Sequence, residues 1–284
     1  MTDLPSFALH ASDVATSVAF YTEKLGFTLL EQRPEEDIAY LRDTDGDRLL
    51  LAGPTVQNLP SYLNERHFIL EPGGSLGFQG EDLEAQQADL RSKGVTDLQL
   101  VQRRTGDRIL RVKTPDNYSF DFIQRASHTF PELLALYARS LDELDEALAG
   151  LSEADMGLTH DVGGWNIRQI VHHIADTDIL FGESMKVALS ASGTKMNRTE
   201  AVGNDKISTE PEYRDRPVAT SVALFRAFHT HILDIVTYIP NAGERYVENS
   251  QGNKSTFSQM ANLIVGHVAE HVDEIWEIRR KHER

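Results

Sequence analysis

Histidines at helical spacing are the residues of this sequence best placed to do chemistry. His267 and His271 are four residues apart, so in a helix both imidazoles project from one face, one turn apart. Two imidazoles in this arrangement can hold one divalent cation. Many such pairs are solvent-exposed helix residues with no ligand, so a metal site needs a further donor from elsewhere in the chain.

A second pair, His172 and His173, can supply that donor. It lies where apolar residues recur at helical spacing, after a capping box formed by Asn166 and Gln169. Burying three unpaired imidazoles in one core is costly, whereas a shared metal satisfies all three. Three neutral ligands also leave a coordination position open, which is typical of a catalytic site. The spacing does not choose between His172 and His173.

Four long helical patterns would position these histidines. They span residues 131–149, 166–190, 218–239 and 257–281. Capping boxes that begin at Thr129 and Thr256 mark the starts of the first and the fourth. Four helices of this length, with no notable strand pattern between them, predict an all-α four-helix bundle. The polar stretch 191–216 is long enough to be a loop over an opening.

The first part of the chain carries a different pattern, in which one unit occurs twice. Each copy reads as a strand, a helix and three more strands, and the two helices fall within residues 13–26 and 82–94. An internal repeat is stronger evidence of architecture than any single element. We therefore expect an α+β protein of two domains. Residues 1–126 form paired βαβββ modules in a cup-shaped sheet, and residues 127–284 form the bundle.

Composition limits the partners and the compartment. The 284 residues carry a net charge of −16, which argues against nucleic acid and anionic membranes as partners. No cysteine is present, so disulfides, thiolate ligands and a cysteine nucleophile are excluded. The start shows no signal peptide, and no apolar run is long enough to span a bilayer. We expect a cytoplasmic protein.

The repeat region resembles the glyoxalase and bleomycin-resistance branch of the vicinal oxygen chelate superfamily. Residues 9–14 and 17–27 carry the resemblance, and residues 114–122 match more loosely. The likeness covers residues 4–125 and is a signature of fold, which by itself names no chemistry. It implies a groove that binds a small molecule, or a module kept for dimerisation or for packing on its neighbour. Both alternatives stay open.

Metal-using members of that superfamily have ligands at positions that align with Ser6, Leu76 and Asp121. Only Asp121 can bind a metal here, and one carboxylate is not a site. His10 is expected one face away from the ligand position and partly exposed. The resemblance therefore implies a cup without metal.

The helical region resembles the DinB-like family of metal-binding four-helix bundles, most closely its bacillithiol S-transferase (YfiT-like) branch. Residues 163–176 and 267–271 carry this resemblance. In that family the second histidine of the pair is the ligand. The resemblance therefore implies His173, His267 and His271 as metal ligands, with His172 pointing away from the metal.

Polar residues near this triad have expected roles. Asp176, one turn after His173, would orient a ligand or hold a proton for a metal-bound water or thiol, or would be a solvated helix carboxylate. Asp178 replaces a histidine common in the closest relatives. Cations near the mouth of the bundle could receive substrate carboxylates. They are Arg168, Lys195, Arg198 and Lys206.

The resemblance favours one function and leaves two others open. One divalent ion, zinc or nickel with iron or manganese as alternatives, would lower the pKa of a low-molecular-weight thiol such as bacillithiol. The thiolate would then attack an electrophile in a detoxification reaction. The same metal could instead activate water for hydrolysis. A non-enzymatic alternative is that the N-terminal domain sequesters a drug-like compound, and a homodimer is one possible assembly.

Overall fold

The computed structural model describes the chain except for residues 1–3, 6, 65–66, 161–163, 197–212 and 250–251. Two compact units divide it, Met1–Ala126 and Ser127–Arg284. Within the described residues, no helix combines the length and apolarity that crossing a membrane requires.

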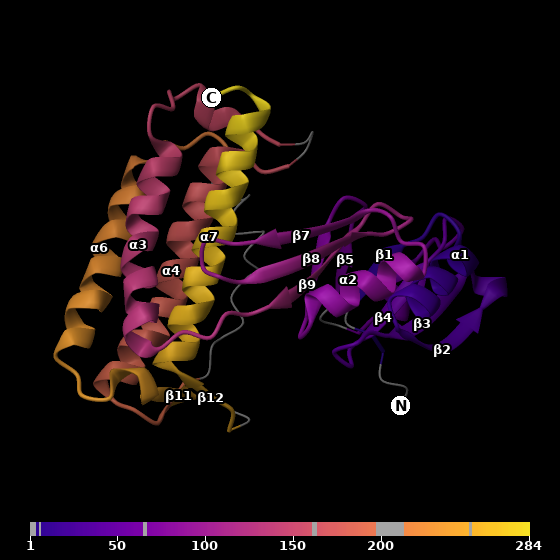
Figure 1. Ribbon diagram of the computed structural model, residues 1–284, viewed down its shortest axis with the longest axis horizontal. Helices are drawn as coiled ribbons and strands as arrows, with labels where there is room; N and C mark the ends of the chain where they lie inside the picture. The colour runs from indigo at the N-terminus through magenta and orange to yellow at the C-terminus, as the bar shows by residue number, and fades with distance from the viewer. Residues whose placement is uncertain (1–3, 6, 65–66, 161–163, 197–212, 250–251) are drawn as a thin grey trace. The chain divides into compact units, whose positions relative to one another are not determined.

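The N-terminal unit contains two sheets (Figure 1). The first has the order β2 (Thr28–Arg33), β3 (Ile38–Arg42), β4 (Arg48–Ala52), β1 (Phe7–His10) and β5 (Phe68–Leu70). The second has the order β6 (Ser75–Gln79), β9 (Ser119–Gln124), β8 (Arg108–Lys113) and β7 (Leu98–Gln102). Helix α1 (Val14–Ala19), continued by a π-helical turn, and α2 (Leu83–Ser92) complete the two copies. The predicted fold class is confirmed for this unit, to which the structure adds β5.

One aromatic core joins the two copies. Tyr21, from the π-helical turn of the first copy, stacks on Phe120 of β9 with ring centres 5.4 Å apart. Phe27 and Phe78 also pack against Phe120. Because side chains alternate along a strand, the alternate residues of β9 are buried together in this core. The two copies of the sequence repeat therefore contribute side chains to the same core.

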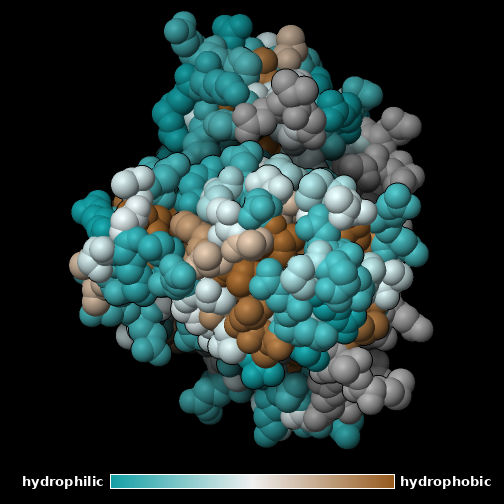
Figure 2. Space-filling model, turned by 90° about the vertical axis from the view of Figure 1, so that its right-hand side faces the viewer, coloured by the Kyte–Doolittle hydropathy of each residue, from teal (hydrophilic) through white to brown (hydrophobic). Residues whose placement is uncertain are grey.

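The surface of this unit includes an apolar area. Figure 2 shows brown side chains gathered on one face inside a polar rim. Large apolar side chains that are exposed in this unit include Leu29 and Phe68. Exposed apolar areas are typical of interaction surfaces, which is compatible with a homodimer. The homodimer stays a prediction.

The C-terminal unit has four long helices that lie side by side (Figure 1). They are α3 (Phe130–Leu148), α4 (Ile167–Ser190), α6 (Ala219–Thr237) and α7 (Phe257–Lys281). The capping boxes at Thr129, Asn166 and Thr256 form as predicted. A small sheet of β10 (Thr194–Lys195), β11 (Tyr246–Glu248) and β12 (Lys254–Thr256) was not predicted. The bundle is confirmed, with this sheet as an addition.

Candidate metal centre

Three histidines from two helices meet inside the bundle. His173 comes from α4, and His267 and His271 come from α7. One nitrogen from each ring lies within 4.8 Å of the other two. The Nε2 atoms of His173 and His267 are 2.9 Å apart, and the ring centres of His267 and His271 are 4.5 Å apart. The three rings therefore converge on one point.

The electrostatics of the triad suit a cation. Burial, with a smaller contribution from neighbouring imidazoles, lowers the pKa of His173 to about 4 and that of His267 to about 2. Both rings are thus neutral near pH 7 and keep a lone pair for a metal. Tetrahedral zinc at its usual bond lengths needs ligand nitrogens about 3.3 Å apart. The Nε2 atoms of His173 and His267 need to move only slightly farther apart to reach that spacing. The donor set therefore fits a divalent ion.

Glu274 and Trp165 complete the surroundings of the triad. The Oε2 atom of Glu274 lies 3.0 Å from Nδ1 of His271, which directs Nε2 of that ring away from the carboxylate. The indole of Trp165 packs edge-on against His173, with ring centres 4.9 Å apart. Neither residue has a role that was predicted from the sequence. The three-residue spacing from His271 to Glu274 is a signal that would have found the carboxylate.

His172 is held away from the triad. Its ring is fully buried, with Nε2 3.1 Å from the carbonyl oxygen of Arg216 and Nδ1 2.7 Å from Oγ of Ser221. A carbonyl can only accept, so Nε2 carries the hydrogen and Nδ1 accepts from Ser221. Burial also lowers the pKa of this imidazole. The structure therefore brings His173, and not His172, to the two histidines of α7.

Asp176 has a partner that the sequence did not reveal. It is half-buried on α4, and its Oδ2 accepts a hydrogen bond from the phenol of Tyr213. Burial, followed by this carboxylate, raises the pKa of Tyr213 to about 12, so the phenol stays protonated and donates. Tyr213 lies at the end of a polar segment with no helical or strand periodicity, so no pattern pointed to it.

Two of the four cations expected at the mouth of the bundle have carboxylate partners. Arg168 is engaged by Glu153, whose Oε2 lies 2.6 Å away, and Lys195 lies 3.8 Å from Glu248. Arg198 and Lys206 lie outside the described residues. The structure adds Arg216, whose guanidinium stacks 4.7 Å from the ring centre of Tyr213.

Asp178 belongs to a separate buried network. Its Oδ1 lies 3.1 Å from Nδ1 of His229 and 3.4 Å from the phenol of Tyr137. The rings of Tyr137 and His229 stack with centres 3.5 Å apart. This network links α3, α4 and α6, so we assign Asp178 to the packing of the helices.

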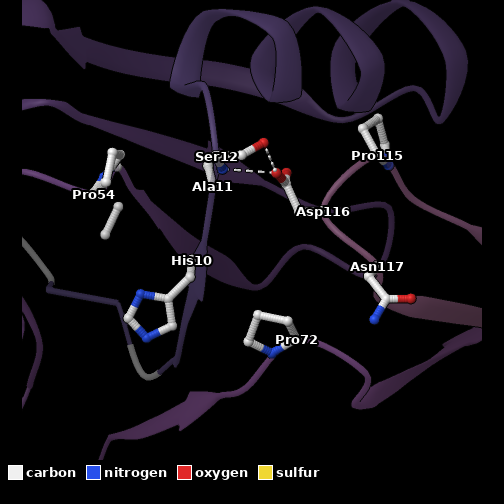
Figure 3. A pocket seen from close by; sticks show the side chains of 10 residues that line it. His10, Ala11, Ser12, Pro54, Pro72, Pro115, Asp116 and Asn117 are labelled. Atoms are coloured by element: carbon white, nitrogen blue, oxygen red, sulfur yellow. Dashed lines mark hydrogen bonds between the residues drawn. The ribbon is translucent and has the colours of Figure 1, made fainter.

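The N-terminal unit offers a hollow at the carboxyl ends of β1 and β4 (Figure 3). Its volume is about 490 Å³. The imidazole of His10 faces it from one side, with Pro72 and Asn117 opposite (Figure 3). Asp116 accepts hydrogen bonds from the backbone and hydroxyl of Ser12, both 2.8 Å long. A small-molecule site in this unit stays a prediction.

The strand register corrects one alignment in the N-terminal unit. Gly77 pairs with Asp121, whereas Leu76 pairs with Phe120 and packs against the apolar core. Leu76 therefore lies on the opposite face from Asp121, and its alignment with a ligand position was wrong. Both oxygens of Asp121 accept from Arg111, at 2.9 and 2.8 Å. Ser6 lies outside the described residues.

Comparisons with known proteins agree with both resemblances. The model of the DinB superfamily matches residues 95–275, and that of the glyoxalase, bleomycin resistance protein and dioxygenase superfamily matches residues 4–122. Both predicted resemblances are thereby confirmed.

Two curated relatives are similar to part of this chain. A protein of Oceanobacillus iheyensis, named a metal-dependent hydrolase, is 26% identical over 43% of this chain and 69% of its own length. One of Bacillus mycoides with the same kind of name is 22% identical over 49% and 79%. Among solved structures, YfiT from Bacillus subtilis has a TM-score of 0.49 at 19% identity, over 56% of this chain and 93% of that one.

Proposed function

Because the chain belongs to the DinB superfamily, we propose that its helical unit is a metal-dependent enzyme in which His173, His267 and His271 hold one divalent cation. The observation that supports this most is the convergence of three imidazole nitrogens within 4.8 Å of one another. Relatives named metal-dependent hydrolases support a metal as well. Zinc and nickel suit imidazole ligands, and iron and manganese are alternatives.

Residues around the triad have distinct tasks in this proposal. A cation bound there would act as a Lewis acid that lowers the pKa of a thiol or water. Glu274 fixes the ring of His271, and Trp165 covers one side of His173. Tyr213 occupies Oδ2 of Asp176, which leaves Oδ1 as the atom that accepts a proton from the nucleophile.

Transfer of a low-molecular-weight thiol to an electrophile is the reaction we propose. A carbon–sulfur bond forms, the leaving group departs from the electrophile, and the thiol proton passes to Asp176. The chain has no cysteine, so the sulfur comes from a substrate such as bacillithiol. The hollow beside His10 would collect the electrophile.

Hydrolysis is the second candidate, and the names of the relatives favour it. The same triad would then activate water. Sequestration of a compound by the N-terminal unit is a third candidate, supported by the hollow at His10.

The test is an assay of zinc-loaded protein with bacillithiol and monochlorobimane, alongside a panel of amides and esters. Thiol transfer predicts a fluorescent conjugate that His271→Ala abolishes and His231→Ala, at an exposed histidine of α6, leaves unchanged. Amide or ester cleavage without conjugation would replace transfer by hydrolysis. Binding of the bimane that survives His271→Ala, with neither reaction, would favour sequestration.

A further inference from the structure

Arg216 is an exposed arginine that contacts His172, the residue before the candidate ligand His173, and it has no carboxylate partner among the described residues. Two other arginines of the same unit have carboxylate partners, Arg168 with Glu153 and Arg226 with Asp145. In a chain with a net charge of −16, carboxylates are abundant. A guanidinium with no carboxylate partner in the part of the chain that the structure describes can bind an anion from solution.

Two aromatic rings hold this arginine. His172 contacts it at both ends, since Nε2 donates to the Arg216 carbonyl at 3.1 Å and Nδ1 lies 3.5 Å from Nη2. The ring of Tyr213 lies beneath the guanidinium at 4.7 Å. Asn166 adds an anchor, because Nδ2 donates to the carbonyl of Arg214 at 3.0 Å. The segment is thus fixed to α4 before any ligand arrives.

The residues that hold Arg216 flank a candidate metal ligand. His172 directly precedes His173, and Asp176, which binds Tyr213, follows it by one helical turn. The guanidinium is therefore held through both neighbours of the ligand on α4. A planar guanidinium binds a carboxylate through two parallel hydrogen bonds, which fixes orientation as well as affinity.

We propose that Arg216 selects substrates that carry a carboxylate close to the group that binds the cation. The proposal rests on the proposed function and deepens it, because it names the class of substrate. A strongly acidic protein repels anions over its surface, so an anionic substrate needs a dedicated cation at the site. Arg216 meets that need where Arg168 and Lys195 do not.

Cobalt-loaded protein gives a direct test that needs no turnover. Binding of a thiolate to cobalt changes the visible spectrum, so dissociation constants can be measured for 3-mercaptopropionate, which carries a carboxylate, and for 2-mercaptoethanol, which does not. We expect Arg216→Gln to weaken binding of the first about 10- to 100-fold, as for the loss of a charged hydrogen bond. Binding of the second should stay within about twofold, since it makes no such bond.

Matched variants separate the outcomes. Arg226→Gln removes the same charge from a paired arginine and should leave both constants unchanged, and Arg216→Lys should recover part of the loss. If Arg216→Gln weakened the binding of both thiols equally, or left the selectivity of the wild type unchanged, this proposal would be overturned and the proposed function would stand. Wild-type protein that binds cobalt but neither thiol, or that binds no cobalt, would overturn the proposed function and this inference with it.

Discussion

The ring of His271 is fixed by a carboxylate three residues further along α7. Glu274 accepts from Nδ1, so the tautomer with a lone pair on Nε2 is favoured. Partners of this kind typically change metal affinity by about 10- to 100-fold. We expect Glu274→Gln to weaken zinc binding by that amount, measured by competition with a chromophoric chelator.

Glu277→Gln is the matched control, because Glu277 is exposed on the same helix, one turn beyond Glu274. It should bind zinc as the wild type does. Equal losses in the two variants would show that Glu274 acts through general charge and not through the ring of His271.

Single residues also mark the limit of what the sequence could predict. Spacing placed His267 and His271 on one face, but only the family resemblance chose His173 over His172. The reason His172 is unavailable lies in Ser221 and Arg216, more than forty residues away. Tyr213 has the same kind of long-range partner in Asp176. Contacts made by packing distant segments leave no local pattern.

At the scale of elements, the buried Asp178–His229 pair joins α4 to α6. Both side chains are fully buried, and Tyr137 of α3 contacts both. Leaving a buried donor or acceptor without its partner typically costs about 1–3 kcal/mol. We expect Asp178→Asn to lower the free energy of unfolding by about 2 kcal/mol, measured in urea.

The exposed pair of Asp145 and Arg226 is the control for that variant. Each side chain is close to half exposed, so Asp145→Asn should cost less than about 1 kcal/mol. If Asp178→Asn were equally mild, the buried network would contribute little to helix packing.

The starts of helices could be predicted where capping residues mark them. The hydroxyl of Thr256 accepts from the backbone of Gln259, and the Gln259 side chain accepts from the backbone of Thr256. Thr256→Ala should therefore destabilise the bundle by about 1 kcal/mol, seen as a lower Tm. Thr256→Ser keeps the oxygen and should remain close to the wild type. A similar loss in both variants would assign the effect to the threonine methyl group.

The elements that were missed are short strands. β5 has three residues and β10 has two, so neither shows an alternation of its own. Each is defined by its neighbour, β5 by pairing with β1 and β10 by pairing with β11. Local sequence predicts helices that carry their own caps better than strands that depend on a distant partner.

At the scale of the whole molecule, two units with separate cores should respond differently to metal. The triad lies within Ser127–Arg284, so an ion stabilises that unit. Zinc at one hundred times its dissociation constant adds about 2.7 kcal/mol. In calorimetry of the full chain, we expect zinc to raise the transition of the helical unit and a chelator to reverse the shift.

His271→Ala identifies the transition of the helical unit, because in this variant zinc should no longer shift the temperature of that transition. His231→Ala should keep the dependence. A zinc shift that persists in His271→Ala would mean that the ion binds elsewhere in the chain.

The metal content of variants that each lack one histidine tests the triad most directly. Elemental analysis of the purified wild-type protein and of His231→Ala should give one divalent ion per chain, because the three ligands are intact in both. His173→Ala, His267→Ala and His271→Ala should each lose the ion while circular dichroism shows that the helices remain. A wild-type protein without stoichiometric metal, or a His173→Ala variant that retains it while His172→Gln loses it, would contradict the assignment.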